Sequence, residues 1–198
     1  MADDILQLLR REHRNLAGLL HVLDRQRHAL NADDTPDYDL MRQIVRYLDG
    51  DGGSDHLPLE EQVFEQVLAR RPALGARTAR LAADHERLRR RGRALIDAAD
   101  SVLSGQPVRR ADLVSLAGVF VADYREHLCR EDNEVFRPLE ASLAPDERRA
   151  LTAALPDAAG AGNDHEYRAL ADRLIVQGAG PAAWAGTARA TCPVCSQG

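Results

Sequence analysis

This 198-residue chain has few aromatic residues and no excess of basic ones. Aromatic residues make up only 4% of the sequence. Leucine, alanine, arginine and glutamate abound, which favours helices and disfavours a β fold. Lys and Arg number 26 against 31 Asp and Glu, giving a net charge of −5. A protein that coats nucleic acid is expected to be basic, so no nucleic-acid partner is predicted.

Long apolar runs and a basic leader are also missing. No stretch of about 18 apolar residues occurs, so we expect neither a membrane span nor a membrane partner. The chain begins with the acidic run Met1-Ala2-Asp3-Asp4 where a secretory signal would be basic, so a cytoplasmic location is expected. The chain has only 3 cysteines, and two of them lie in its last seven residues, so no disulfide framework is expected for the body.

The remaining pattern predicts an all-α fold, because apolar residues recur at helical spacing and no long alternation typical of strands is present. Long helices joined by short connections are typical of an up-down-up-down antiparallel four-helix bundle. A short extra helix and a flexible tail would follow the bundle. The expected helices cover about 4–30, 37–70 with a break at 50–55, 74–103, 110–143 and 164–176. The expected divisions are a bundle over 1–143, a helical extension over 144–180 and a tail over 181–198.

Histidines occupy positions where each bundle helix should present apolar side chains to the core. Core positions recur at alternating steps of three and four residues. His13 follows this line on the first helix, His56 on the resumed second helix, His85 on the third and His127 on the fourth. One inward histidine is usually a hydrogen-bonded core residue, but four of them in one bundle indicate that they form a common site.

Two of these histidines are followed by glutamate at the same spacing. The segments His56-x-x-x-Glu60 and His127-x-x-x-Glu131 place an imidazole and a carboxylate about 6 Å apart on one helix face. A lone pair of this kind is usually a surface feature. Carboxylates buried without partners would cost several kcal/mol each, and a bound cation removes that cost. The sequence therefore predicts a buried metal site.

The donor set indicates more than one ion. Four imidazoles and two carboxylates exceed what a single tetrahedral zinc requires. They suit two iron ions, with bridging carboxylates and two histidines on each ion, although manganese and zinc accept the same ligands. The order His-x-x-x-Glu is also the reverse of the Glu-x-x-His motif of ferritin-like bundles.

In these residues the chain resembles the hemerythrin-like family, the HHE cation-binding domain, over about residues 1–143. The segment 56–64, HLPLEEQVF, is similar to the family's HHPKEDxxF, with Leu57 in place of the second histidine. The segment 131–138, EDNEVFRP, is similar to the family's EExxxFP. Together with His13 and His85 in the same order, these pieces make the resemblance specific.

The resemblance implies a four-helix bundle with an oxo- or hydroxo-bridged non-haem di-iron centre. It implies that both glutamates bridge the ions and that the histidines bind them in two pairs. Family members carry or sense oxygen, sense or store iron, or handle nitric oxide damage. The expected partner is thus a small diatomic ligand or peroxide. An enzyme that activates O2 or reduces peroxide or NO is the alternative, and a homodimer is allowed. The implied ligands are Glu60 and Glu131 as bridges, His13 and His56 on one ion, and His85 and His127 on the other.

One position departs from the oxygen carriers of the family, which have a second histidine four residues after the one matching His85. Arg89 occupies that position here. A guanidinium does not deprotonate to bind a metal. We therefore expect an open or water-filled position, or recruitment of Glu134, and chemistry other than simple reversible oxygen carriage.

Two further features leave alternatives open. Tyr124 lies one turn before His127, either as a partner of the centre or as a core tyrosine with its hydroxyl paired nearby. Cys192-Pro193-Val194-Cys195 is half of a thiolate metal site. It could form a reversible disulfide, share a metal with a second copy, or have no role. Cys129 is expected to be an inert surface thiol.

Overall fold

The computed structural model describes residues 4–32, 34–49, 56–155 and 165–176. Every regular element in these ranges is helical, which confirms the all-α prediction for this part of the chain. None of the described helices is both long and apolar enough to cross a lipid bilayer. The elements are α1 (Ile5–Asn31), α2 (Tyr38–Asp49), α3 (His56–Arg70), a 3-10 turn (Pro72–Leu74), α4 (Gly75–Leu103), α5 (Arg110–Glu131), a π-helical segment η2 (Asp132–Phe136), α6 (Arg137–Ser142), α7 (Pro145–Ala153) and α8 (His165–Val176).

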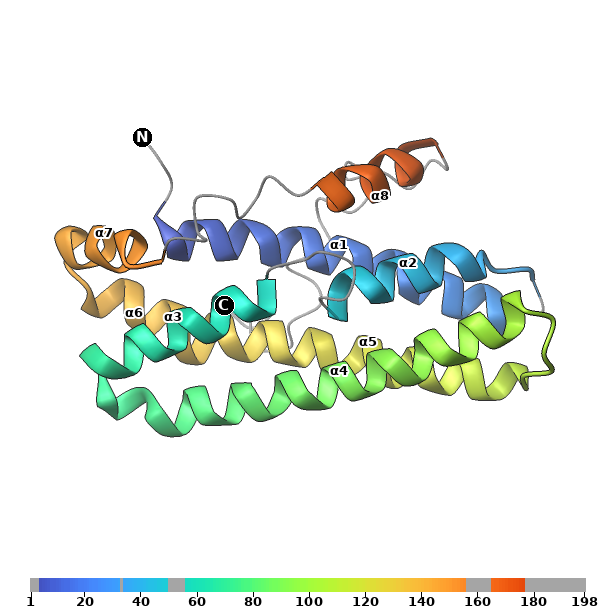
Figure 1. Cartoon of the computed structure of the whole chain (residues 1–198), viewed down its shortest axis with the longest axis horizontal. Helices are drawn as coiled ribbons and strands as arrows, with labels where there is room; N and C mark the ends of the chain where they lie inside the picture. Colours follow the sequence, from blue (N-terminus) through green and yellow to red (C-terminus); the bar gives the residue numbers. More distant parts are fainter. Residues whose placement is uncertain (1–3, 33, 50–55, 156–164, 177–198) are drawn as a thin grey trace.

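The long helices α1, α4 and α5 lie side by side along the longest axis of the molecule (Figure 1). Helix α1 packs against α5, and α4 packs against both α5 and α2. Helices α2 and α3 are separate elements on the same side of the molecule, α6 and α7 lie at one end, and α8 packs against α2. Helices α1, α3, α4 and α5 each contribute to the site described below.

Local sequence explains where these helices begin. Asp4 caps α1, because its carboxylate accepts a hydrogen bond from the Gln7 backbone while the Gln7 side chain accepts one from the Asp4 backbone. This reciprocal pair satisfies two of the backbone donors that a helix start leaves unpaired. Pro58 lies in the first turn of α3, where its missing N–H costs nothing.

The apolar interior consists of two clusters. One surrounds α2 and the adjoining halves of α1, α4 and α5, and the other joins the start of α1 to α3, α6 and α7. Residues at the boundary are polar. On α1, His13 separates Leu9 of one cluster from Leu16 of the other, and on α4 His85 separates Leu81 from Leu88. The buried histidines and glutamates thus form a layer between two apolar clusters.

The helix expected over about 110–143 is present as one uninterrupted helical stretch over 110–142. The structure adds a π-helical segment within it, which divides the stretch into α5, η2 and α6. One extra residue per turn changes which side chains point inward, so Val135 and Phe136 are buried while Glu134, expected on the inward face, is only partly buried. Helix α7 was not predicted. The division of the chain at residues 143 and 180 remains a prediction.

Candidate metal centre

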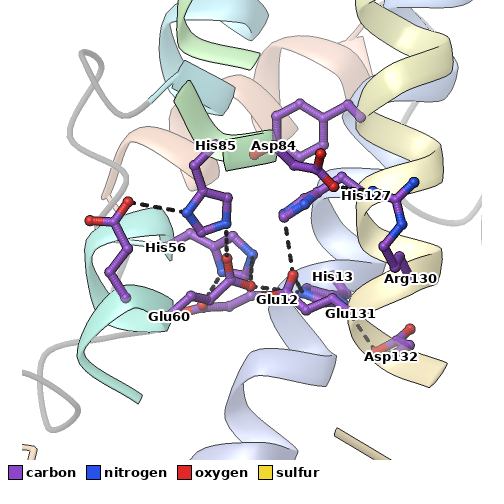
Figure 2. A network of polar contacts seen from close by, with 12 residues as sticks. Glu12, His13, His56, Glu60, Asp84, His85, His127, Arg130, Glu131 and Asp132 are labelled. Atoms are coloured by element: carbon purple, nitrogen blue, oxygen red, sulfur yellow. Dashed lines mark hydrogen bonds and ion pairs between the residues drawn. The ribbon is translucent and has the colours of Figure 1, made fainter. Parts of the chain in front are cut away.

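The six histidines and glutamates predicted to bind metal come together in the middle of the helices (Figure 2). Their side chains form two overlapping groups in which the potential ligand atoms lie within 4.8 Å of one another. Every member is at most 5% exposed. The groups are His13, His56 and Glu60, and Glu60, His85, His127 and Glu131. Glu60 belongs to both.

Each histidine turns its Nε2 atom toward the two glutamates. The Glu60 Oε1 atom lies 3.0 Å from His13 Nε2 and 2.8 Å from His56 Nε2. The other oxygen of Glu60 lies 3.5 Å from His85 Nε2. One carboxylate therefore faces imidazoles on both sides, as a bridging ligand must.

Glu131 has a similar position from the opposite helix. Its Oε2 atom lies 3.3 Å from Nε2 of His127, one turn earlier on α5, and 3.4 Å from Nε2 of His13 on α1. The predicted spacing of four residues thus brings each imidazole and its glutamate to the same face.

The outer Nδ1 atoms of three histidines face a second set of carboxylates, Glu12, Asp132 and Glu61. The sequence left open whether Glu61 is a ligand and did not indicate the other two. His56 Nδ1–H donates to Glu12 at 2.8 Å, and His13 Nδ1–H donates to Asp132 at 3.1 Å. Because a carboxylate can only accept, these bonds leave each Nε2 available to a cation. Each of these carboxylates is adjacent in the sequence to a predicted ligand, and this adjacency is the feature of the sequence that could have indicated them.

Strong electrostatic coupling accompanies this packing. Burial lowers the pKa of His13, but its close contacts with the carboxylates of Asp132, Glu131 and Glu60 raise it overall to well above its usual value. Burial likewise opposes the protonation of His56, yet the charge of Glu60 and its hydrogen bonds raise the pKa to about 9. The pKa of Glu60 is held well below its usual range despite burial, because charged His56 and hydrogen bonds from imidazoles favour the carboxylate.

Several atoms that point into the centre make no hydrogen bond with the described residues. They are Glu60 Oε2, His85 Nε2, His127 Nε2 and both carboxylate oxygens of Glu131. Buried polar atoms without partners cost free energy unless a bound group satisfies them. Donors of imidazole and carboxylate type, buried and converging, fit a metal cation.

The sequence profile described as Hemerythrin HHE cation binding domain matches residues 4–139. The chain belongs to this family. Among curated proteins and among solved structures, no similar chain was found. The match includes all four helices that contribute to the centre of this HHE domain.

Arg89, which departs from the oxygen-carrier pattern, lies beside the centre of the HHE domain and contacts Glu61. Its guanidinium donates to Glu61 Oε1 at 2.7 Å, and the same oxygen accepts a hydrogen bond of 3.1 Å from His85 Nδ1. Glu134 belongs to neither group of potential ligands among the described residues. Its backbone carbonyl instead accepts a hydrogen bond from Arg77.

The remaining sequence expectations for the HHE domain have different outcomes. Tyr124 is fully buried and donates its hydroxyl to the Leu48 carbonyl at 2.9 Å, as a core tyrosine would. Burial, followed by the charges of the central carboxylates, raises the pKa of its hydroxyl well above the usual value, so the phenol stays neutral. The expectation of a free thiol at Cys129 is wrong, because this residue is disulfide-bonded. Cys192 and Cys195 lie outside the described residues.

Proposed function

We propose that this HHE domain is a non-haem di-iron protein that binds or senses O2, a related small molecule such as NO or peroxide, or iron itself. The proposal treats α1, α2 with α3, α4 and α5 as the four helices of an antiparallel bundle. Glu60 and Glu131 would bridge the ions, His13 and His56 would hold one ion, and His85 and His127 would hold the other.

A single observation carries this proposal, namely that Glu60 belongs to both groups of potential ligands. Its two oxygens face different histidines, Oε1 toward His13 and His56 and Oε2 toward His85. A carboxylate in this position can neutralise two cations at once, which a site for one ion does not require. Two reduced iron ions would supply the electrons that a bound oxidant accepts.

The chain's own residues would prepare the site for a small ligand. Apolar clusters on both sides restrict water, and carboxylates outside the centre fix the orientation of the imidazoles. Arg89 bonds Glu61 and would not supply a ligand, which would leave a coordination position on the His85 side for an exogenous one. This position favours binding or sensing over storage of a fully coordinated pair of ions.

Metal analysis and a visible spectrum of the aerobically purified protein test the proposal. About two iron ions per chain, with absorption typical of bridged ferric iron, are expected. Full incorporation of only one metal per chain, or no iron, zinc or manganese at all, would contradict it.

An enzyme that activates O2 or reduces peroxide or NO is the second candidate, and the same position near Arg89 favours it. Stopped-flow mixing of the reduced protein with each oxidant separates the two functions. A binding protein reacts once for each centre, whereas an enzyme consumes oxidant repeatedly when a reductant is supplied.

A further inference from the structure

The four imidazoles of the centre differ in what their outer Nδ1 atoms contact. His13 and His56 each have a carboxylate of their own, Asp132 and Glu12. The Glu12 side chain is only 16% exposed, so its hydrogen bond to His56 is shielded from water. Both carboxylates increase the electron density that these imidazoles can offer to a cation.

His85 has weaker support from Glu61. The Glu61 side chain is 42% exposed, and one oxygen of it accepts hydrogen bonds from both His85 and Arg89. The contact to Arg89, at 2.7 Å, is the shorter of the two. The Arg89 guanidinium therefore partly neutralises the Glu61 carboxylate, and it adds a positive charge beside His85.

His127 has no such support, because its Nδ1 is buried and makes no hydrogen bond among the described residues. The three supporting carboxylates each adjoin a ligand from a different helix. Asp84, which adjoins His85, would continue this series, but it is bound by Arg130 and by Arg87 instead. The carboxylate next to His85 in the sequence is thus neutralised by two arginines and supports no imidazole.

We propose that the two metal positions are unequal, with the His13–His56 position binding its cation about ten-fold or more tightly than the His85–His127 position. Carboxylates that hold metal-binding histidines typically change affinity by about 10–100-fold when removed. One position has two carboxylates that contact no arginine among the described residues, Glu12 and the partly exposed Asp132, whereas the other has one carboxylate that is shared with Arg89. The chain would therefore carry one resident and one exchangeable cation. This inference rests on the proposed di-metal function.

Titration of the metal-free full chain with Co²⁺ tests the inference. Visible absorption and competition with a chelator would measure both binding steps, and two steps that differ by about ten-fold or more are expected. Glu12→Gln should weaken the tight step by about 10–100-fold and change the weak step little. Glu61→Gln should weaken only the weak step. Glu65→Gln, an exposed change on the same helix as Glu61, is the matched control.

Two equal steps in the unmodified protein would overturn the inference while leaving the di-metal proposal intact. Weakening of the tight step by Glu61→Gln would also overturn it, because the order of the positions would be reversed. Absence of Co²⁺ binding, or binding of one ion only, would overturn the proposed function together with the inference. Since the unmodified chain alone decides between equal and unequal steps, a variant that fails to fold does not prevent the test.

Discussion

Each imidazole of the centre has one nitrogen directed at the glutamates and another directed at the surrounding protein. Substitutions of the ligands themselves should therefore remove both the metal and a structural connection between helices. Since metal binding is linked to folding, the two losses should occur together.

His56→Ala and Glu131→Ala are expected to lower metal content below two ions per chain and to lower the melting temperature of the metal-loaded protein. Elemental analysis and thermal unfolding measure the two effects. His28→Ala is the control, because the His28 side chain is 64% exposed. Equal metal content and melting temperature in the ligand variants would contradict the assignment.

Arg89→His should slow the oxidation of the reduced protein by air. The new imidazole would lie one turn after His85, where it could fill the coordination position that we propose Arg89 leaves open, and the loss of the guanidinium would release Glu61 to support His85. The rate of oxidation on mixing with O2 measures the effect, with exposed Arg90→His as the control. If the unmodified protein instead takes up and releases O2 over many cycles, the role given to Arg89 is wrong.

The sequence was sufficient to predict that six polar side chains face inward and come together, because they stand out against a helical apolar pattern. Their role as metal ligands stays a prediction. The sequence was not sufficient for Glu12 or Asp132. Each lies one position from a predicted ligand, where a helix usually faces solvent. Glu12 on α1 finds its partner on α3, and Asp132 finds its partner on α1, so both contacts depend on how the helices pack. The disulfide at Cys129 was not predicted, because the position of a cysteine on a helix gives no sign of disulfide bonding.

Helix boundaries that depend on local signals were predicted well. The start of α1 at its Asp4 cap and the end of α4 near residue 103 follow from capping and turn residues. The π-helical segment has no such signal. It allows Glu131 to face the centre while Asp132, the next residue, contacts His13. Tertiary contacts, rather than propensity, stabilise this wider turn.

Two glycines inside long helices give a matched test of helix packing. Replacing glycine by alanine in a helix interior gains about 0.8–1 kcal/mol from propensity alone. A Cβ at Gly118 would meet the flexible Arg27 side chain at 3.4 Å, whereas one at Gly92 would lie 3.2 Å from Asp49 and 3.3 Å from Phe120. Gly118→Ala should therefore raise the free energy of unfolding by about 0.5–1 kcal/mol.

Gly92→Ala should lower the free energy of unfolding relative to Gly118→Ala by about 1 kcal/mol or more, since its neighbours belong to packed helices. Chemical denaturation of both variants measures the difference. An equal increase in the free energy of unfolding for Gly92→Ala and Gly118→Ala would mean that α2 and α4 can move apart slightly without a cost in stability.

For the whole molecule, rising pH should lower the stability of the metal-free protein and increase the stabilisation that bound metal provides. The pKa of His56 is about 9 in the folded metal-free protein, against about 6.5 when unfolded. Protonation of His56 therefore stabilises the fold fully below about pH 6.5, and this contribution is lost as the pH rises through about 9. The pKa of His13 is raised in the same direction.

Metal binding requires neutral imidazoles, so it releases protons and strengthens as the pH rises over this range. The melting temperature of the metal-free chain should fall between pH 6.5 and about 9. The difference in melting temperature between the metal-loaded and metal-free chains should grow over the same range. Parallel curves for the two forms would indicate that His56 does not bind the cation.

The two groups of ligands also differ in when they become available during synthesis. His13, His56 and Glu60 all lie within the first 60 residues, whereas the other group requires His127 and Glu131. A chain emerging from the ribosome thus exposes three donors of one position early, but Glu131, which would bridge both ions, and Asp132, which contacts His13, emerge only at the end of α5. The second position can close only when α5 has emerged and packed against α1 and α4. We expect stable cation binding to begin only when α5 has packed against α1 and α4, so that metal uptake would mark completion of the central fold.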